Sequence, residues 1–169
     1  MRLQRDNIVS KAVFYDIFQS PLGYLYLIFS GKVLSGVSFQ KPSDIPFKKG
    51  HAPKIFLKQL SVYFQGGNKE FSQEVVFLAG TEFEKKVWSV LKKIPFGETR
   101  TYKWVAEKIG KPAAARAVGQ ALSKNPIPIV IPCHRVIESD GSLGGYSSGV
   151  EVKKRLLEME YYASMDEQI

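Results

Sequence analysis

The stretch TYKWVAEKIGKPAAARAVGQALS, residues 101–123, decides how the second half of this chain folds. Its first part places apolar side chains on one helical face and stops at Gly110, and the part after Pro112 again has helical spacing. We expect Pro112 in the first turn of the second helix, where proline is tolerated. Two short helices joined by a glycine turn predict a helix-turn-helix.

Basic residues are concentrated in the same part of the chain. The 169 residues carry a formal net charge of +8, and residues 99–126 hold six Lys or Arg side chains against one acid, Glu107. On the second predicted helix, Arg116 lies about 200° around the axis from the inward Val118. It shares the outer face with Gly119, Gln120 and Ser123. A small, polar face around one cation suits a nucleic-acid backbone or a narrow groove, although a plain solvated face is the alternative.

The first half has the pattern of strands. Residues 11–18, 24–30 and 33–40 are rich in aromatic and β-branched side chains and are separated by turns, which predicts an antiparallel meander. Residues 41–53 read as a loop, and a helix with apolar spacing follows until QGG at 65–67. Residues 70–80 predict a further strand and a linker. We therefore expect a small α/β N-terminal domain, residues 1–79, and a mainly helical domain, residues 80–169.

Two helix starts are predicted in the second domain. Thr81 and Glu84 have the spacing of a capping box, and so do Ser148 and Glu151, which would open a last helix reaching about Met165. The apolar stripe of that last helix is expected to contain Val152, Leu156, Met159 or Glu160, and Ala163. A carboxylate on a core-facing stripe is costly unless it is paired. Glu160 is therefore expected to pair with His134, or else to lie solvated at the helix edge.

IPCHRV, residues 131–136, contains the only cysteine and one of the two histidines. A lone cysteine is by default a small buried hydrophobe, but an imidazole oriented by Glu160 would promote the reactive thiolate. The prolines before Cys133 predict a stiff, extended segment from 123 to 136, in which Asn125 ties a turn. The glycine- and serine-rich residues 139–149 predict a loop with backbone amides free for a ligand.

Composition excludes several classes of protein. One cysteine excludes an intramolecular disulfide, and with two histidines it leaves too few soft ligands for an ordinary structural zinc site. We therefore expect no metal and no cofactor. No stretch has the length of a transmembrane helix or the form of a signal peptide. The sequence predicts a soluble, monomeric protein in the cytoplasm, or in the nucleus if it is eukaryotic.

IPCHRVI, with RAVGQALSKNPIPIV before it and GGYSSG and VKKRLLEME after it, resembles the O6-alkylguanine-DNA alkyltransferases, also called methylated-DNA–protein-cysteine methyltransferases. The resemblance covers roughly Thr81–Glu160. It implies a winged-helix-like helix-turn-helix domain after a ribonuclease-H-like domain, which the first half fits in length and pattern. Part of that family holds zinc in its first domain, and this chain lacks the cysteines for it.

The resemblance implies a role for each matching residue. Cys133 would accept the alkyl group in one irreversible turnover, His134 would act as base through a water, and Glu160 would orient His134. Tyr102 would protonate or hydrogen-bond the departing guanine, and Asn125 would brace the turn that joins the recognition helix to the active-site strand. The carbonyls of Cys133 and Val136 would read the exocyclic amine of guanine, and the pocket wall would consist of Tyr146, Ser147 and Ser148. Ser148 occupies a position where the family often has glycine, and this difference bears on whether the pocket tolerates bulky alkyl groups.

The partner implied is double-stranded DNA with O6-alkylguanine or O4-alkylthymine. Arg116 would fill the gap left by the flipped nucleotide, with Thr101, Gly119, Gln120 and Ser123 as further DNA contacts. Chemistry agrees, because an alkyl group on O6 is buried in the duplex and the nucleotide must leave the stack to reach a thiolate. The thioether product is stable, and no second cysteine could resolve it.

Two other functions fit parts of the pattern. A Cys/His/Glu hydrolase that forms a thioester would explain the triad but neither the basic helix pair nor the outward Arg116. More than one product equivalent per protein would favour it. A sensor that binds damaged DNA without transfer would explain the helices, but alkyltransferase-like sensors lack the acceptor cysteine, and Cys133 is present here.

Overall fold

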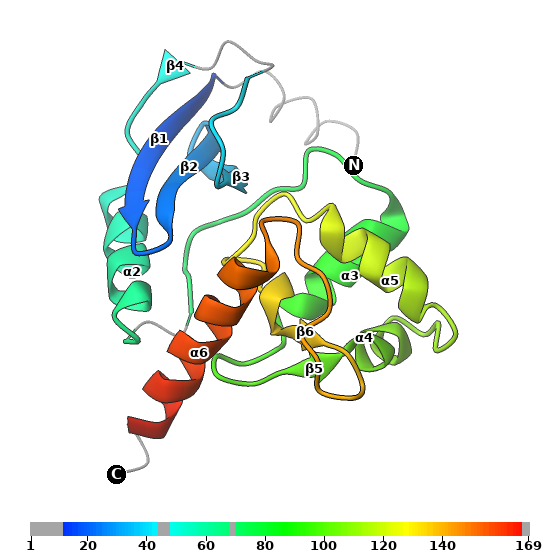
Figure 1. Cartoon of the computed structure of the whole chain (residues 1–169). Coiled ribbons are helices and arrows are strands. Elements are labelled where there is room, and N and C mark those ends of the chain that lie inside the picture. Colours follow the sequence, from blue (N-terminus) through cyan, green and yellow to red (C-terminus); the bar gives the residue numbers. More distant parts are fainter. Residues whose placement is uncertain (1–11, 44–47, 68–69, 167–169) are drawn as a thin grey trace.

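The computed structural model describes residues 12–43, 48–67 and 70–166. It places a sheet and one helix beside a cluster of helices (Figure 1). The sheet has the order β3-β2-β1-β4, with bounds β1 Val13–Ser20, β2 Gly23–Ser30, β3 Val33–Ser38 and β4 Lys48–Lys49. The β1–β2 and β2–β3 pairs are antiparallel, which confirms the predicted meander. Lys11, at the start of the first predicted strand, lies outside the described residues.

Strand β4 differs from the expectation of a loop over residues 41–53. It pairs in parallel with β1, through Phe14 with Lys48 and Tyr15 with Lys49. A strand of two residues is too short to produce an alternating pattern, so periodicity could not indicate it.

Helix α2, Lys54–Phe64, packs on this sheet and confirms the predicted helix. Its buried side chains are Phe56, Leu60 and Tyr63. The ring of Phe56 meets that of Phe29 from β2 edge-on at 6.1 Å between centroids. Gly66, with φ of 81°, follows the helix in the left-handed conformation that glycine adopts readily.

The strand predicted within residues 70–80 is wrong. Only one parallel bridge forms there, between Leu34 and Val75, with hydrogen bonds of 2.9 Å on each side of Leu34. Further along the same edge of β3, the N–H of Val37 instead donates to the carbonyl of Pro126 at 2.9 Å. The second half of the chain therefore occupies the edge that a longer strand would need.

The second half contains the predicted helices. These are α3 Glu82–Leu91, α4 Tyr102–Lys108 and α5 Ala115–Ser123, which pack on one another. The capping box of Thr81 and Glu84 is confirmed in both directions, at 3.1 and 2.9 Å. A parallel pair of short strands, β5 Arg100–Thr101 and β6 Val136–Ile137, lies next to α4. This arrangement is the predicted winged-helix-like helix-turn-helix.

One helix boundary within this motif was predicted wrongly. Gly110 makes the turn between α4 and α5, with φ of 76°, as expected. Helix α5 begins only at Ala115, and Pro112 lies before it in a turn closed by the N–H of Ala114 on the carbonyl of Lys111. A proline tolerates the turn as well as the first helical positions, so its presence alone does not fix where a helix begins.

Residues 123–136 are not extended, contrary to the prediction. The N–H of Ile131 donates back to the carbonyl of Ile127 at 2.9 Å, and a 3-10 helix, η1, follows at Cys133–Arg135. The side chain of Asn125 holds this loop, because it donates to the carbonyl of Ile131 at 2.8 Å and accepts from the N–H of Ile127 at 3.0 Å. Ile129 has φ of 74°, which is rare for a β-branched residue and is therefore imposed by its surroundings.

The last helix, α6, spans Val150–Asp166. The predicted capping box at Ser148 is wrong, because Gly149 precedes the first helical residue and Ser148 lies one position too early. Leu156 and Glu160 are buried as expected, but so is Lys153, which the sequence did not single out.

The hydrophobic core is continuous across the two halves. One cluster of buried side chains includes Leu27 and Phe29 from the sheet and Trp88 and Ile127 from the second half. The division into domains at residues 79 and 80 stays a prediction. Within the described residues, no helix combines the length and the apolar character needed to cross a membrane.

Candidate active site

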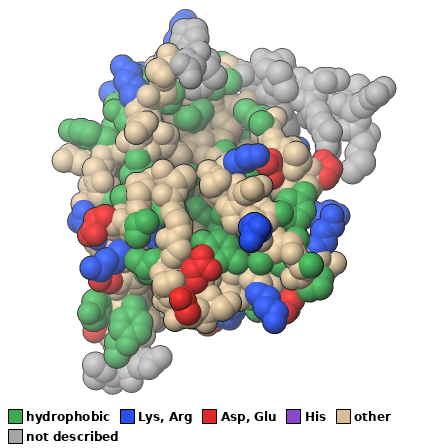
Figure 2. Space-filling model, turned by 45° about the vertical axis from the view of Figure 1, so that its right-hand side comes forward, with side chains coloured by type: hydrophobic (Ala, Val, Ile, Leu, Met, Phe, Trp, Pro, Cys, Tyr) green, Lys and Arg blue, Asp and Glu red, His purple; other side chains and the backbone are tan. Residues whose placement is uncertain are grey.

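Cys133 lies at the inner wall of a cavity of about 640 Å³, and only 3% of its surface is exposed. A cavity of this size accommodates a small organic ligand such as a nucleobase. We call it the Cys133 cavity. It is lined by Tyr102, Ala115, Arg116, Gly119, Leu122, Ser123, Cys133, Glu138, Gly145, Tyr146 and Ser147. Figure 2 shows apolar side chains on the face that carries α4 and α5, with Lys and Arg side chains around them and some Asp and Glu side chains between.

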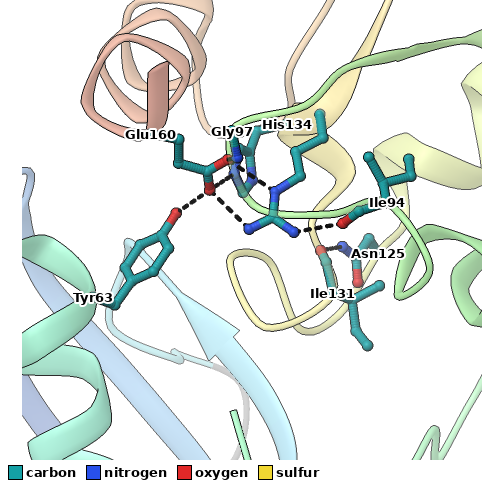
Figure 3. A network of polar contacts seen from close by, with 8 residues as sticks. Tyr63, Ile94, Gly97, Asn125, Ile131, His134 and Glu160 are labelled. Atoms are coloured by element: carbon teal, nitrogen blue, oxygen red, sulfur yellow. Dashed lines mark hydrogen bonds and ion pairs between the residues drawn. The ribbon is translucent and has the colours of Figure 1, made fainter. Parts of the chain in front are cut away.

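Behind the thiol, five residues form a buried polar group around one carboxylate, which we call the Glu160 cluster (Figure 3). Oε1 of Glu160 lies 2.7 Å from Nε2 of His134 and accepts from the hydroxyl of Tyr63 at 2.7 Å and from Nη2 of Arg135 at 3.0 Å. Oε2 accepts from Nε of Arg135 at 2.9 Å and from the N–H of Gly97 at 3.2 Å. The predicted pairing of His134 with Glu160 is therefore present.

The Glu160 cluster is closed to solvent. His134 is 0% exposed and Glu160 is 1% exposed, so the alternative of a solvated carboxylate at the helix edge is wrong. Burial alone would raise the pKa of Glu160, but His134 and Arg135 outweigh it and hold that pKa far below its usual range. Glu160 is consequently ionised at every pH at which the protein would act.

The environment also selects the form of His134. Burial lowers the pKa of His134, against the opposing effect of Glu160, so the imidazole is neutral at neutral pH. An ionised Glu160 can only accept, so the proton of the neutral ring sits on Nε2. Nδ1 is then a free acceptor, and it has no hydrogen-bond partner among the described residues. His134 can therefore act as a base, because its unprotonated Nδ1 makes no hydrogen bond to the Glu160 cluster.

The thiol itself is protonated at rest. Burial raises the pKa of Cys133, and the nearby side chains of Asn125, Lys153 and Tyr146 counteract only part of that effect. A reaction at the sulfur therefore needs a base, and the neutral His134 next to it in the chain can supply one. One water molecule between Nδ1 and the sulfur would connect them.

Lys153 is a further buried charge, on α6. Its side chain is 0% exposed, and Nζ donates to the carbonyls of Val136 at 2.6 Å and Gly145 at 3.3 Å. Nζ also lies 5.9 Å from the ring centroid of Tyr102. The predicted reader of guanine, the Val136 carbonyl, thus already accepts one hydrogen bond. Sequence reasoning missed Lys153, although it shares a helical stripe with Leu156 and Glu160.

Three members of the Glu160 cluster were also missed. Tyr63 read as one more apolar residue of α2, and Gly97 contributes only its backbone. Arg135 follows His134 directly and its Nη1 donates to the carbonyl of Ile94 at 2.7 Å, which ties the turn after α3 to η1. The signal for Arg135 was its place in IPCHRV, because a cation among apolar residues needs a buried anion.

The open wall of the cavity carries several predicted residues. Burial raises the pKa of Tyr102, and Glu138 and Cys133 raise it further, so its phenol keeps its proton. Gly119 lies against Tyr102, since a Cβ on it would meet the ring at 3.6 Å. Arg116 and Ser123 are exposed, as predicted for the outer face of α5.

The remaining predicted residues lie outside the cavity lining. Gln120 is exposed on α5, and Ser148, the residue after Ser147, is partly buried. Thr101 caps α4, accepting from the N–H of Trp104 at 3.1 Å. Its DNA contact stays a prediction. Three predicted residues lie on the side of the thiol away from the cavity: Asn125, His134 and Glu160. Glu138, which sequence reasoning missed, lies on the cavity side.

Two family models match the chain. The ribonuclease-like domain of 6-O-methylguanine DNA methyltransferase matches residues 13–77, and the DNA binding domain of the same family matches residues 82–162.

Individual proteins match over most of their length. A methylated-DNA–protein-cysteine methyltransferase of Methanosarcina barkeri is 46% identical over 88% of this chain and 97% of its own. One from Mycobacterium leprae is 45% identical over 83% of this chain and 88% of its own. The crystal structure of Mycobacterium tuberculosis OGT in complex with DNA is similar, with a TM-score of 0.84 and 41% identity over 89% of this chain and 94% of that one.

Proposed function

The chain belongs to the methylated-DNA–protein-cysteine methyltransferase family, and we propose that it repairs O6-alkylguanine in duplex DNA by moving the alkyl group to Cys133. We extend the substrate to O4-alkylthymine, whose alkyl group is attached to an equivalent exocyclic oxygen. We also propose that the protein acts as a monomer in the cytoplasm, or in the nucleus of a eukaryote. The observation that carries the proposal is a buried thiol facing a nucleobase-sized cavity, with a neutral histidine behind it.

The transfer is one displacement at carbon. The thiol of Cys133 gives its proton through a water to Nδ1 of His134, and the sulfur forms a bond to the alkyl carbon. The bond between that carbon and O6 breaks, and its electron pair goes to the guanine. The proton of Tyr102 neutralises the guanine, and the proton held by His134 then restores the phenol through solvent. Nothing hydrolyses the resulting thioether, so each molecule reacts once.

The Glu160 cluster supports the charge that develops behind the sulfur. When His134 takes the proton it becomes a cation inside the protein, which is costly unless an anion is adjacent. Glu160 is that anion, and it is held by donors before the reaction starts, so the protein need not reorganise. Lys153 acts from the cavity side, because its positive charge favours the thiolate.

The cavity holds the flipped base. Tyr102 faces it with a phenol that keeps its proton until guanine leaves, and Tyr146 and Ser147 form part of the cavity wall. The carbonyls of Cys133 and Val136 accept hydrogen bonds from the exocyclic amine. Ser148, in the same loop as Tyr146 and Ser147, narrows the space for the alkyl group. Asn125 positions Cys133, because its amide fixes the carbonyl of Ile131 two residues before the thiol.

Helix α5 recognises the duplex. Arg116 enters the stack from the minor-groove side and replaces the extruded nucleotide, as an inserted side chain does in other proteins that unstack DNA. Gly119, Gln120 and Ser123 allow the helix to approach the backbone, and Thr101 adds a contact at the start of α4. The net charge of +8 draws the protein to phosphate.

Intact mass after incubation with methylated duplex DNA tests the function. We expect a gain of one methyl group per molecule, located on Cys133, and no second equivalent in excess substrate. Product beyond one equivalent per protein would contradict the proposal and favour a thioester-forming hydrolase. Binding of damaged DNA without any mass gain would instead make the protein a sensor.

A further inference from the structure

In the described part of the chain, Glu138 is the one titratable residue lining the Cys133 cavity that the proposed mechanism leaves without a role. It lines the cavity with Cys133 and Tyr102 and is exposed. Among the described residues, no hydrogen bond or ion pair involves its carboxylate. Its charge interacts with the buried Lys153 without forming an ion pair, and a negative charge on a surface that approaches phosphate is unfavourable. A ligand that donates a hydrogen bond to it would offset that cost.

The position of Glu138 is well defined. Its N–H donates to the carbonyl of Ser142 at 3.0 Å, and its carbonyl accepts from the N–H of Gly141 at 3.0 Å. This turn closes the loop that follows β6. The backbone therefore presents Glu138 from a fixed base, two residues after Val136.

The carboxylate lies close to Tyr102. A Cβ placed on Gly144 would be 2.7 Å from the hydroxyl of Tyr102 and 3.3 Å from Oε1 of Glu138. The two oxygen atoms are thus no farther apart than the sum of these distances. Apart from burial, Glu138 is the main cause of the raised pKa of Tyr102, which agrees with their proximity. A base that meets the Tyr102 hydroxyl also comes within reach of Glu138.

The hydrogen bonds already made inside the protein indicate why a bound base would need Glu138 as an acceptor. The Val136 carbonyl, one of the two proposed acceptors of the amine, already accepts from Nζ of Lys153 at 2.6 Å. A base with a donating exocyclic amine would find one free lone pair there, whereas the carboxylate of Glu138 has all of its own available.

We propose that Glu138 makes the protein prefer alkylguanine to alkylthymine, by sharing with the Val136 carbonyl one of the two hydrogens of the exocyclic amine of the flipped guanine, while the Cys133 carbonyl accepts the other. This proposal rests on the proposed function. Guanine carries an NH₂ donor at that edge, while thymine presents only the O2 acceptor. A carboxylate attracts the first and repels the second, so its effect on the two bases has opposite sign.

The test compares two substrates that differ only in that amine. O6-methylguanine and O6-methylhypoxanthine are placed in the same duplex, and single-turnover methyl transfer is measured for wild type and Glu138→Ala. Loss of a hydrogen bond to a charged group should slow transfer from methylguanine about tenfold. Transfer from methylhypoxanthine should change by less than about twofold, and transfer from O4-methylthymine should become faster.

Two further variants complete the design. Glu138→Gln keeps an acceptor oxygen and should recover part of the rate on methylguanine. Asp140→Asn removes one charge from the same loop but keeps the oxygen that accepts from the N–H of Ser142 at 2.9 Å, so it should leave the preference unchanged. Equal losses on both purines, or a preference altered as much by Asp140→Asn, would overturn the role of Glu138. A wild-type protein that gains no methyl group would refute the proposed function instead.

Discussion

The two sides of Cys133 are built in opposite ways. Behind it, Glu160 binds donors from α2, η1 and the turn at Gly97, and every atom of its carboxylate is occupied within the chain. In front of it, the carboxylate of Glu138 and the guanidinium of Arg116 line an open cavity. The Glu160 cluster is complete before substrate arrives, and the cavity is completed by substrate.

This difference separates two kinds of contribution to the rate. A group behind the thiol acts on the sulfur and the imidazole whatever base is present, so its loss should slow all substrates by one factor. A group in front touches the base or the DNA, so its loss should depend on which substrate is offered. The variants below test that separation.

Cys133→Ser should have the largest effect, because Cys133 belongs to both sides. A hydroxyl is far less acidic than a thiol, so no alkyl transfer is expected from any substrate. Duplex affinity should stay close to that of wild type, since the thiol does not face the phosphates. Mass spectrometry and a DNA-binding titration measure the two properties. A serine variant that accepted the alkyl group would remove the need for a thiolate.

Glu160→Gln should have the next largest effect. The variant leaves Arg135 as a buried cation without its anion, which should lower the free energy of unfolding by about 3 kcal/mol. The imidazolium also loses its partner, so the apparent pKa of Cys133 should rise and transfer at neutral pH should slow about tenfold per unit. Single-turnover rates on duplex and on free O6-alkylguanine should fall equally. Unequal losses would place Glu160 on the substrate side.

The same variant has a defined pH dependence. The pKa of Glu160 is lowered in the folded protein, while that of an unfolded glutamate is about 4.3. The stability that the carboxylate provides is therefore complete well above that value and is lost as the pH falls toward the folded pKa. Denaturant titrations of wild type and Glu160→Gln should differ by a constant amount near neutral pH, and the difference should begin to shrink below about pH 4 and continue to shrink as the pH falls further. A difference that persisted in acid would indicate lost packing rather than lost charge.

Arg116→Ala tests the substrate side. Removing the side chain that replaces the flipped nucleotide should slow repair in duplex DNA about tenfold, because unstacking costs a few kcal/mol. Attack on free O6-alkylguanine should hardly change. Equal losses on the two substrates would move Arg116 into the chemical step. Wild-type affinity for the duplex should also weaken with salt, as phosphate contacts release counterions.

The sequence predicted those elements and residues that a local pattern marks. The apolar spacing after Thr81 and the strand pattern of the first half each extend over enough residues to specify an element. The glycine at position 110 marks the turn between two such patterns. Glu160 stood out because it broke an apolar stripe, and IPCHRV because it held the only thiol.

The sequence did not predict the groups whose role depends on tertiary contact. Tyr63 fits an apolar stripe as well as phenylalanine would, so nothing marked its hydroxyl as a donor. Glu138 lies between the IPCHRVI motif and the loop predicted at residues 139–149, so no pattern singled it out.

The turn at Asn125 was predicted and is present, but the prolines predicted an extended segment before Cys133. The bond from Ile131 back to Ile127 and the φ of 74° at Ile129 depend on surroundings that local preference does not encode.

Tyr63→Phe is the variant with the smallest expected effect, and it tests whether the first half of the chain takes part in the reaction. Tyr63 is buried, and burial together with Glu160 raises its pKa well above the usual value, so its hydroxyl always donates. Removing this donor to an ionised carboxylate should lower the free energy of unfolding by about 2 kcal/mol. Tyr63 also helps to hold Oε1 against His134, so transfer should slow about threefold, equally on duplex and free base. Tyr24→Phe, at an exposed tyrosine of β2, is the matched control and should change neither quantity. An unchanged rate with the same loss of stability would make Tyr63 a residue of the core alone, and a faster rate would mean that its hydroxyl competes with His134 for the carboxylate.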